Sequence, residues 1–270
     1  MARLNVQGPG KGGAMTFDIL LKKVKLRLLR MHYESKVGHI GGNLSSIDAI
    51  LFLHSKVMKE GDVFVLSKGH SAGALYVTLW ATGKLSDEDL KTFHGDGTKL
   101  AGHPVGGWMP DIPFSTGSLG HGVGLSAGRA LAKKLKHEEG MVYCLTSDGE
   151  WQEGSTWESL IFIAHHKLKN ITLLIDANGL QGFGNTMEVA SMALLADKIR
   201  PFDVTVLEID GHNPEALDSA LNAESLLPKV IILRTVKGNG ISFMEGRMEW
   251  HYLPMTEAQY LKAVEEVSAE

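Results

Sequence analysis

The sequence predicts an α/β fold, a doubly wound parallel sheet with helices on both faces. Near-continuous apolar segments, which are typical of strands buried in a parallel sheet, alternate with helical segments in the second half of the chain. At 270 residues, the chain is long enough for a large domain with a substantial core. Neither a repeat nor a low-complexity tract nor a linker interrupts it, so residues 15–270 are predicted to form one α/β domain.

The first half of the chain is predicted to be mainly helical. Apolar residues at helical spacing indicate a helix over residues 16–33, which the glycine-rich stretch 38–42 should end. Ser45 or Ser46 should cap a second helix over residues 47–57. Beyond it, the sequence predicts a strand at 62–67, a helix at 72–81, a capped helix start at 86–89, a long loop at 95–116 and a helix at 117–136.

The second half has the regular alternation of strands and helices that builds parallel sheets. Strands are predicted at 141–146, 171–175, 204–209 and 229–236, and helices at 155–166, 187–198 and 214–224. Parallel strands deliver their carboxyl ends to one edge of the sheet. Polar residues that follow these strands are therefore expected to lie together at that edge.

Composition argues against several classes of protein. The net charge is −4 and no basic stripe is present, which argues against a nucleic-acid partner. No apolar run is long enough to span a membrane. The single cysteine, Cys144, lies in a predicted strand and should be a buried thiol, consistent with the cytoplasm. Residues 1–14 lack an apolar segment and are predicted to be a flexible leader or an added extension, with Met15 as the natural start.

Oxygen-bearing residues follow two of the predicted strands. The run Ser147-Asp148-Gly149-Glu150 follows the strand at 141–146, and Asp176-Ala177-Asn178-Gly179-Leu180 follows the strand at 171–175. A carboxylate, an amide oxygen and a main-chain carbonyl can bind Mg2+, and glycine-rich turns beside a helix start can hold a diphosphate. Each run alone fits an ordinary turn. Their occurrence at two strand ends favours a metal and diphosphate site.

Five histidines directly follow a glycine: His39, His70, His103, His121 and His212. Taken singly, each fits a surface or hydrogen-bonded core histidine. As a set they favour ligand recognition, because glycine lets the backbone approach a ligand and imidazole can move protons near neutral pH. The sequence has no HExxH pattern and no Cys/His pair at ligand spacing, so zinc is not predicted. Glu153 fits a favourable charge near a helix start, and a catalytic carboxylate there would have to meet a group from outside this domain.

From about residue 16 to its end, the chain resembles the N-terminal, diphosphate-binding part of transketolases. The two strand-end runs would fit any thiamine-diphosphate enzyme, and the glycine–histidine loops narrow the resemblance to the transketolase group. The other motifs that carry it are Gly38-His39-Ile40-Gly41-Gly42, Leu66-Ser67-Lys68-Gly69-His70, Gly102-His103-Pro104 and Thr116-Gly117-Ser118-Leu119-Gly120. Two departures are Ser147, where the family has the first glycine of its Gly-Asp-Gly motif, and Tyr252, where glycine usually follows the histidine.

The resemblance implies transfer of a two-carbon ketol unit from a ketose to an aldose, with thiamine diphosphate and Mg2+, for which Ca2+ or Mn2+ could substitute. The metal ligands that it implies are Asp148, Asn178 and the carbonyl of Leu180. It places His70, Gly117, Leu119, Asp148, Gly149, Glu150, Asn178 and His251 at the cofactor, counts His39, His103, His70 and His251 as catalytic, and puts Glu153 and Glu158 at a subunit interface linked to cofactor activation.

The resemblance also implies a partner. The glutamate that activates the cofactor and the aromatic pocket for its pyrimidine belong, in the family, to a second domain that this sequence lacks. We therefore expect a split enzyme in which a C-terminal transketolase subunit completes an α2β2 assembly. The alternatives are the α subunit of a 2-oxo-acid dehydrogenase or decarboxylase, and a non-catalytic paralogue. Which sugars react, and whether they are phosphorylated, is left open by the sequence.

Overall fold

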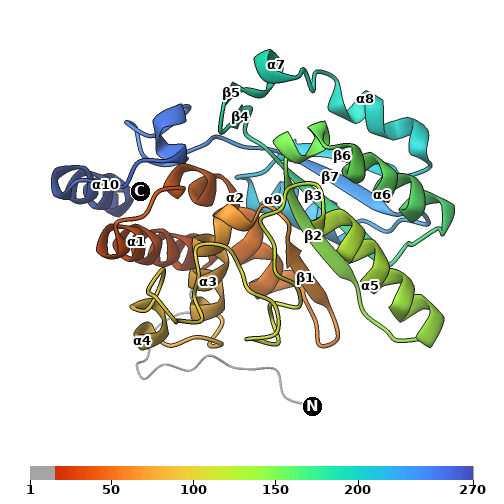
Figure 1. Cartoon of the computed structure of the whole chain (residues 1–270), viewed down its shortest axis with the longest axis horizontal. Helices are drawn as coiled ribbons and strands as arrows, with labels where there is room; N and C mark the ends of the chain where they lie inside the picture. The colour runs from red at the N-terminus through yellow and green to blue at the C-terminus, as the bar shows by residue number, and fades with distance from the viewer. Residues whose placement is uncertain (1–15, 270) are drawn as a thin grey trace.

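A computed structural model describes residues 16–269, which form a parallel sheet with helices on both sides (Figure 1). In spatial order, the strands of this sheet are β1 (Val63–Leu66), β2 (Val142–Ser147), β3 (Ile171–Ala177), β7 (Lys229–Arg234) and β6 (Thr205–Asp210). All neighbouring strands are parallel. The predicted fold class is confirmed. The predicted leader, residues 1–14, and the predicted start at Met15 lie outside the described residues.

Helices cover both faces of the sheet (Figure 1). They are α1 (Phe17–Ser35), α2 (Ile40–Phe52), α3 (Ala72–Ala81), α4 (Asp87–Leu90), α5 (Gly122–Lys136), α6 (Gly154–His165), α7 (Thr186–Val189), α8 (Leu195–Ile199), α9 (Pro214–Asn222) and α10 (Glu257–Ala269). Single helical turns add η1 (Leu53–Val57), η2 (Gly69–Ser71), η3 (Gly149–Gln152), η4 (Arg200–Phe202) and η5 (Met248–His251), and β4 (Leu180–Gln181) pairs with β5 (Gly184–Asn185) in a small hairpin.

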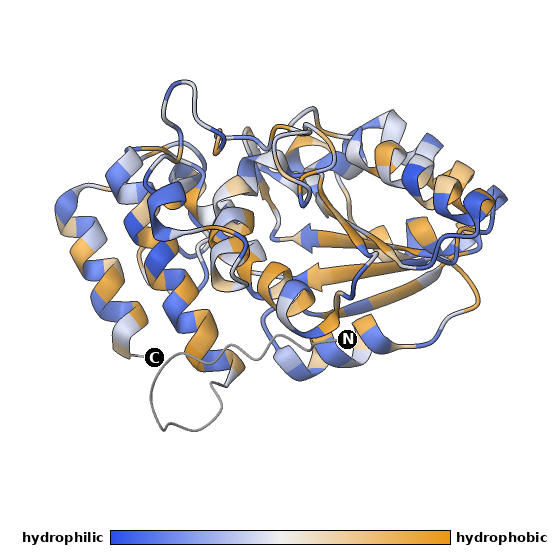
Figure 2. Cartoon of the chain, turned by 90° about the horizontal axis from the view of Figure 1, so that it is seen from below, coloured by the Kyte–Doolittle hydropathy of each residue, from blue (hydrophilic) through white to orange (hydrophobic). Residues whose placement is uncertain are grey.

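Alternate residues of each strand enter two different cores. Leu145 of β2 packs into the core formed with α1, α2, α3, α9 and α10, whereas its neighbour Cys144 packs into the core formed with α5, α6 and α8. Figure 2 shows the apolar strands in the interior between helices that carry hydrophilic residues. Burial raises the pKa of the Cys144 thiol to about 12, which makes it the inert core thiol that the sequence predicts.

The start of α2 differs from the prediction. The helix begins at Ile40, so Ser45 and Ser46 lie inside it rather than at its cap. The glycines were expected to stop a helix, but they allow close packing at the start of one. A Cβ on Gly38 would lie 2.3 Å from the carbonyl oxygen of Tyr252, so only glycine fits there.

Two further predictions were wrong in detail, and one helix was not predicted. The helix expected from residue 117 begins at Gly122, because Gly117 and Gly120 have the positive φ values of 118° and 82° that helices exclude. The helix expected at 187–198 is divided into α7 and α8, since Leu194 is left-handed. Helix α10 was not predicted; it packs on α1, where Tyr33 and Tyr260 stack with ring centroids 4.4 Å apart. Within residues 16–269, no helix is both long and apolar enough to cross a bilayer.

Candidate active site

The two oxygen-bearing runs meet at the carboxyl edge of the sheet. In the register of β2 and β3, Ser147 lies opposite Asp176. The main-chain N–H of Asp148 donates to the carbonyl of Asp176 over 3.1 Å, and the N–H of Gly179 donates to Oδ2 of Asp148 over 2.7 Å. The sheet thus brings Asp148 and the turn around Asn178 together, as the sequence predicts.

These runs form one wall of a cavity of about 290 Å³. The predicted site residues that line it are His39, His70, His103, Gly117, Leu119, Asp148, Gly149, Asn178, Leu180 and His251. Glu150 does not line it: this buried carboxylate accepts hydrogen bonds from Ser67 and from the N–H groups of Gly120 and Ser147. Glu153 and Glu158 are exposed outside it. Their predicted role at a subunit interface stays a prediction.

Asp148 is a buried carboxylate with no cation in contact. Its side chain accepts hydrogen bonds from the main-chain N–H groups of Gly149 and Gly179, and no lysine, arginine or histidine of the described chain forms an ion pair with it. Burial, followed by the negative charge of Asp176, raises the pKa of Asp148 to about 6. A cation placed against this carboxylate would relieve both effects.

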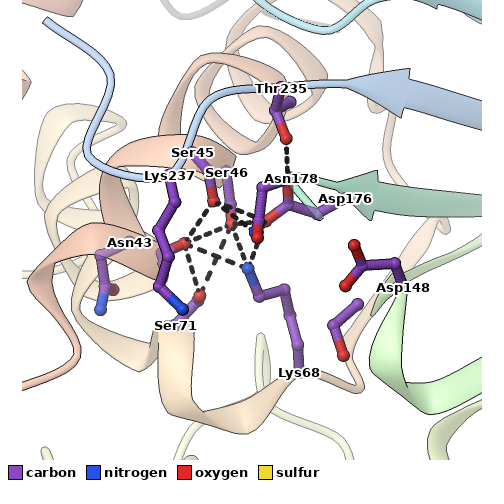
Figure 3. A network of polar contacts seen from close by, with 12 residues as sticks. Asn43, Ser45, Ser46, Lys68, Ser71, Asp148, Asp176, Asn178, Thr235 and Lys237 are labelled. Carbon is purple, nitrogen blue, oxygen red and sulfur yellow. Dashed lines mark hydrogen bonds and ion pairs between the residues drawn. The ribbon is translucent and has the colours of Figure 1, made fainter. Parts of the chain in front are cut away.

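Asp176 is the opposite case. Its carboxylate is fully buried and forms an ion pair with Lys68, whose side chain is only 1% exposed. Thr235 and Ser45 also donate to it, the latter over 2.6 Å (Figure 3). Burial alone would raise the pKa of Asp176, but the charge of Lys68 and these hydrogen bonds outweigh burial and hold the pKa below its ordinary value.

Asn178 and Leu180 present oxygens beside Asp148. The Asn178 Nδ2 donates to Asp176 over 3.2 Å, and Oδ1 accepts from the N–H of Leu180 over 3.0 Å. The carbonyl of Leu180 lies 3.4 Å from the Nζ of Lys237. Burial, and then the charge of Lys68, lowers the pKa of Lys237 to about 8, so it remains mostly an ammonium at neutral pH.

Four histidines form the other wall. The ring of His39 lies between those of His251, His70 and His103, with centroids 5.1, 5.6 and 6.1 Å away. His39 itself has a φ of 65°, and its N–H donates to the carbonyl of His251. A Cβ on Gly117 would lie 2.6 Å from the His103 ring, so this glycine lets the ring pack closely.

The four imidazoles are neutral at physiological pH. Burial is the main cause in each case: the pKa of His39 falls to about 4, that of His251 to about 3, and those of His70 and His103 also fall. The Lys237 ammonium donates to Nδ1 of His251 over 2.8 Å, which places the proton of that ring on Nε2. Neutral imidazoles can both donate and accept, which suits the binding of hydroxyl groups and proton transfer.

Sequence reasoning missed three charged residues of this site. Lys68 and Asp176 stood inside motifs but were given no role, and Lys237 was not considered. All three are buried. No local sequence signal marks them, because charged residues are rarely buried unless paired, and the pairing is set by the tertiary structure.

The donor set fits a divalent cation. Asp148, Asn178 and the carbonyl of Leu180 offer the hard oxygens that Mg2+ prefers, and the uncompensated burial of Asp148 is a direct reason for a cation to bind. No group of three or more His, Cys, Asp or Glu side chains in residues 16–269 could hold a metal by itself. The remaining positions of an octahedral shell would therefore come from water or from phosphate oxygens.

Comparison with known proteins identifies the family. Residues 25–267 match the family described as transketolase, thiamine diphosphate binding domain. The chain belongs to the transketolase family. Among curated relatives, one of the subunits of an apulose-4-phosphate transketolase, from Phocaeicola vulgatus, is 37% identical, and the match covers 94% of both chains. A 6-deoxy-6-sulfo-D-fructose transketolase subunit from Clostridium sp. is 36% identical over 87% of this chain and 90% of the relative.

Solved transketolase structures agree with this assignment. The enzyme from Campylobacter jejuni superposes with a TM-score of 0.87 and 29% sequence identity, over 93% of this chain and 42% of the other. Among the curated sequences, human transketolase is 33% identical over 83% of this chain and 37% of its own length. The chain thus spans less than half the length of these two transketolases.

Proposed function

We propose that this chain is the thiamine-diphosphate-binding N-terminal subunit of a two-chain transketolase, which transfers a two-carbon ketol unit from a ketose to an aldose. The observation that carries the proposal is the cavity itself. One wall offers oxygens for a cation, and the other offers four neutral histidines. Relatives of matching extent are named as single subunits of transketolases, which favours this function over that of a 2-oxo-acid dehydrogenase subunit.

In this proposal Asp148, Asn178 and the Leu180 carbonyl would hold Mg2+, and the same wall of the cavity would receive the diphosphate. Gly149, Gly117 and Leu119 line the cavity without bulky polar groups, so the cofactor can lie against them. Bound thiamine diphosphate supplies the carbon centre at which the carbon–carbon bond of the sugar is broken and formed. Cofactor affinity should therefore depend mainly on the wall of the cavity formed by Asp148, Asn178 and Leu180, which we call the oxygen wall.

The histidines act on protons and hydroxyl groups. His251 presents its Nε2–H as a donor because Lys237 occupies Nδ1. His70 lies beside it, with ring centroids 5.5 Å apart, so these two residues can donate to the diphosphate. His39 and His103 remain for the hydroxyl and carbonyl groups of the sugar, and their neutral rings can accept a proton and return it.

The partner would supply the glutamate that activates the cofactor and the pocket for its pyrimidine. We propose a C-terminal transketolase subunit that carries the pyrimidine-binding domain, assembled with this chain as α2β2 in the cytoplasm. Glu153 and Glu158 are exposed and thus accessible to such a partner. Sugar or sugar-phosphate substrates are consistent with the relatives, which are named for a ketose phosphate and a sulfonated ketose.

The test is reconstitution. This chain, its C-terminal partner and their mixture are assayed for ketol transfer with thiamine diphosphate and Mg2+, using phosphorylated, sulfonated and unsubstituted ketoses. We expect activity from the mixture only. Robust turnover by this chain alone would refute the two-chain proposal, and oxidative decarboxylation of a 2-oxo acid by the mixture would refute the ketol-transfer assignment.

A further inference from the structure

The buried carboxylate of Asp176 lies directly behind the amide of Asn178. It does not line the cavity, and its two oxygens have different partners. Oδ1 accepts from Thr235, whereas Oδ2 accepts from Lys68, Ser45, Ser46 and Asn178. Figure 3 shows this network, with Lys68 and Asn178 meeting at Asp176, and Asp148 nearby with no contact drawn to the network.

The chemistry of Asp176 allows only one orientation of the Asn178 side chain. An ionised carboxylate accepts hydrogen bonds and donates none, so the group that faces it must be the amide NH2. The Nδ2 of Asn178 lies 3.2 Å from Oδ2 of Asp176 and 3.3 Å from the hydroxyl of Ser45. The reversed amide would place its oxygen against the carboxylate, acceptor against acceptor.

The orientation of this amide decides whether Asn178 can serve as a metal ligand. With Nδ2 turned toward Asp176, Oδ1 lies on the opposite side, where it accepts from the N–H of Leu180 over 3.0 Å. An amide oxygen can bind a hard cation and an amide NH2 cannot. The network behind Asn178 thus selects the atom that it offers.

Lys68 stabilises the buried carboxylate of Asp176 in its ionised form. Asp176 is fully buried and Lys68 is 1% exposed, so neither charge is compensated by water. The Lys68 ammonium also donates to the carbonyl of Gly42 over 3.1 Å and to Ser46 over 2.9 Å, which fixes it at the start of α2. The carboxylate therefore has a permanent counter-ion that is independent of any ligand.

We propose that Asp176, with Lys68 as its built-in counter-ion, is a positioning residue that turns the amide oxygen of Asn178 toward the cation site. Asp176 does not line the cavity, and Lys68, which does, has its ammonium paired with Asp176. This inference rests on the proposed function, because it gives Asn178 its place as a ligand. It predicts that metal affinity is lost when the acceptor-only character of residue 176 is lost, even if the fold is intact.

The decisive variant is the double substitution Lys68→Met and Asp176→Asn. It removes both buried charges and keeps the side-chain volumes close, a change that often leaves the stability of a folded protein intact. An asparagine at 176 can offer either its oxygen or its NH2, so the orientation of Asn178 is no longer fixed. Mn2+ binding to the full chain in the presence of thiamine diphosphate is measured by the electron paramagnetic resonance signal of free Mn2+, alongside thermal melting.

We expect the double variant to melt as a folded protein and to bind Mn2+ about 10- to 100-fold more weakly than the wild type. The matched control is Thr235→Val, which removes the hydrogen bond to the oxygen of Asp176 that Asn178 does not contact. Its Mn2+ affinity should stay within about threefold of the wild type, although it loses a buried hydrogen bond. A role that was only structural would instead make affinity follow melting temperature across both variants.

A second variant keeps both charges in place. Ser45→Ala removes the other acceptor for Nδ2 of Asn178 and should weaken Mn2+ binding by less than about threefold. A tenfold or larger loss would assign the orientation to Ser45 and overturn the role of Asp176. Equal Mn2+ affinity of the wild type and the folded double variant would also overturn it. If the wild-type chain itself did not bind Mn2+ with thiamine diphosphate, the proposed function would fail first.

Discussion

Two aspartates lie at the same edge of the sheet and are buried to nearly the same degree, yet they are held in opposite ways. Asp176, at 0% exposure, has the ammonium of Lys68 in contact, and its pKa is lowered. Asp148, at 5% exposure, has only main-chain N–H groups, and its pKa rises to about 6. Asp176 is thus neutralised within the folded chain, whereas Asp148 is left as a carboxylate that can bind an added cation. Both are needed, because the first orients the ligand that stands beside the second.

The largest expected effect comes from removing the internal cation. Lys68→Met leaves the Asp176 carboxylate buried without a counter-ion, which should lower the free energy of unfolding by about 3–5 kcal/mol. Urea denaturation of the metal-free chain measures it. The control Lys91→Met removes a lysine from an exposed pair with Glu88 and should cost no more than about 1 kcal/mol. Equal losses in the two variants would mean that the buried pair does not stabilise the fold.

Removing Asp148 should weaken cofactor binding and leave the stability of the metal-free chain intact. Asp148→Ala deletes a carboxylate that is costly to bury, so the metal-free chain should unfold at a similar or higher urea concentration. Thiamine diphosphate binding in the presence of Mg2+ should weaken by about 100-fold or more, because the charged ligand is gone. Titration calorimetry with and without Mg2+ measures it. Asp218→Ala, on the exposed surface of α9, is the control and should bind like the wild type.

The histidine wall should affect turnover rather than cofactor affinity. His103→Ala removes a neutral imidazole from the sugar side of the cavity and should lower kcat of the reconstituted enzyme by about 100-fold. Affinity for thiamine diphosphate should change little, since the oxygen wall is intact. His121→Ala, a histidine of another glycine–histidine pair that does not line the cavity, serves as the control. A large loss of cofactor affinity in His103→Ala would move this residue to the diphosphate.

His32 is a buried base with no counter-ion among the described residues, and its effect on the pH dependence of stability should be the smallest of the four expected effects. Its ring is 1% exposed, and burial lowers its pKa from 6.5 to about 4. The unfolded chain therefore takes up a proton more readily, and stability that is complete above pH 6.5 is lost as the pH falls toward 4. At pH 5 the loss amounts to about 2 kcal/mol. In His32→Leu the fall in the free energy of unfolding between pH 7 and pH 5 should be smaller by that amount. An unchanged pH dependence would exclude His32 as its source.

The sequence could predict the oxygen wall because two simple rules locate it. Buried apolar strands are visible as apolar runs, and parallel strands end at one edge, so the residues after them meet. Asp148 and Asn178 follow from these rules alone. The glycine–histidine loops were likewise visible, although only the structure shows that four of the chain's histidines surround one cavity.

The sequence could not predict the charged network behind that wall. Lys68 and Asp176 are 108 residues apart, and nothing local marks a lysine that will be buried. The start of α2 was missed because glycine usually ends helices, whereas here Gly41 allows close packing: a Cβ on it would lie 3.1 Å from the side chains of Lys237 and Trp250. Helical periodicity at 187–198 likewise gave no warning of the left-handed Leu194. Tertiary packing decides each of these points.

The most direct measurement is a crystal structure of the chain with its C-terminal partner, grown with thiamine diphosphate and Mn2+, with anomalous scattering to locate the metal. We expect one strong peak in contact with a carboxylate oxygen of Asp148, Oδ1 of Asn178 and the carbonyl oxygen of Leu180, while Asp176 remains paired with Lys68. A cofactor bound with the metal away from Asp148, or with Asp176 as the ligand, would contradict this expectation.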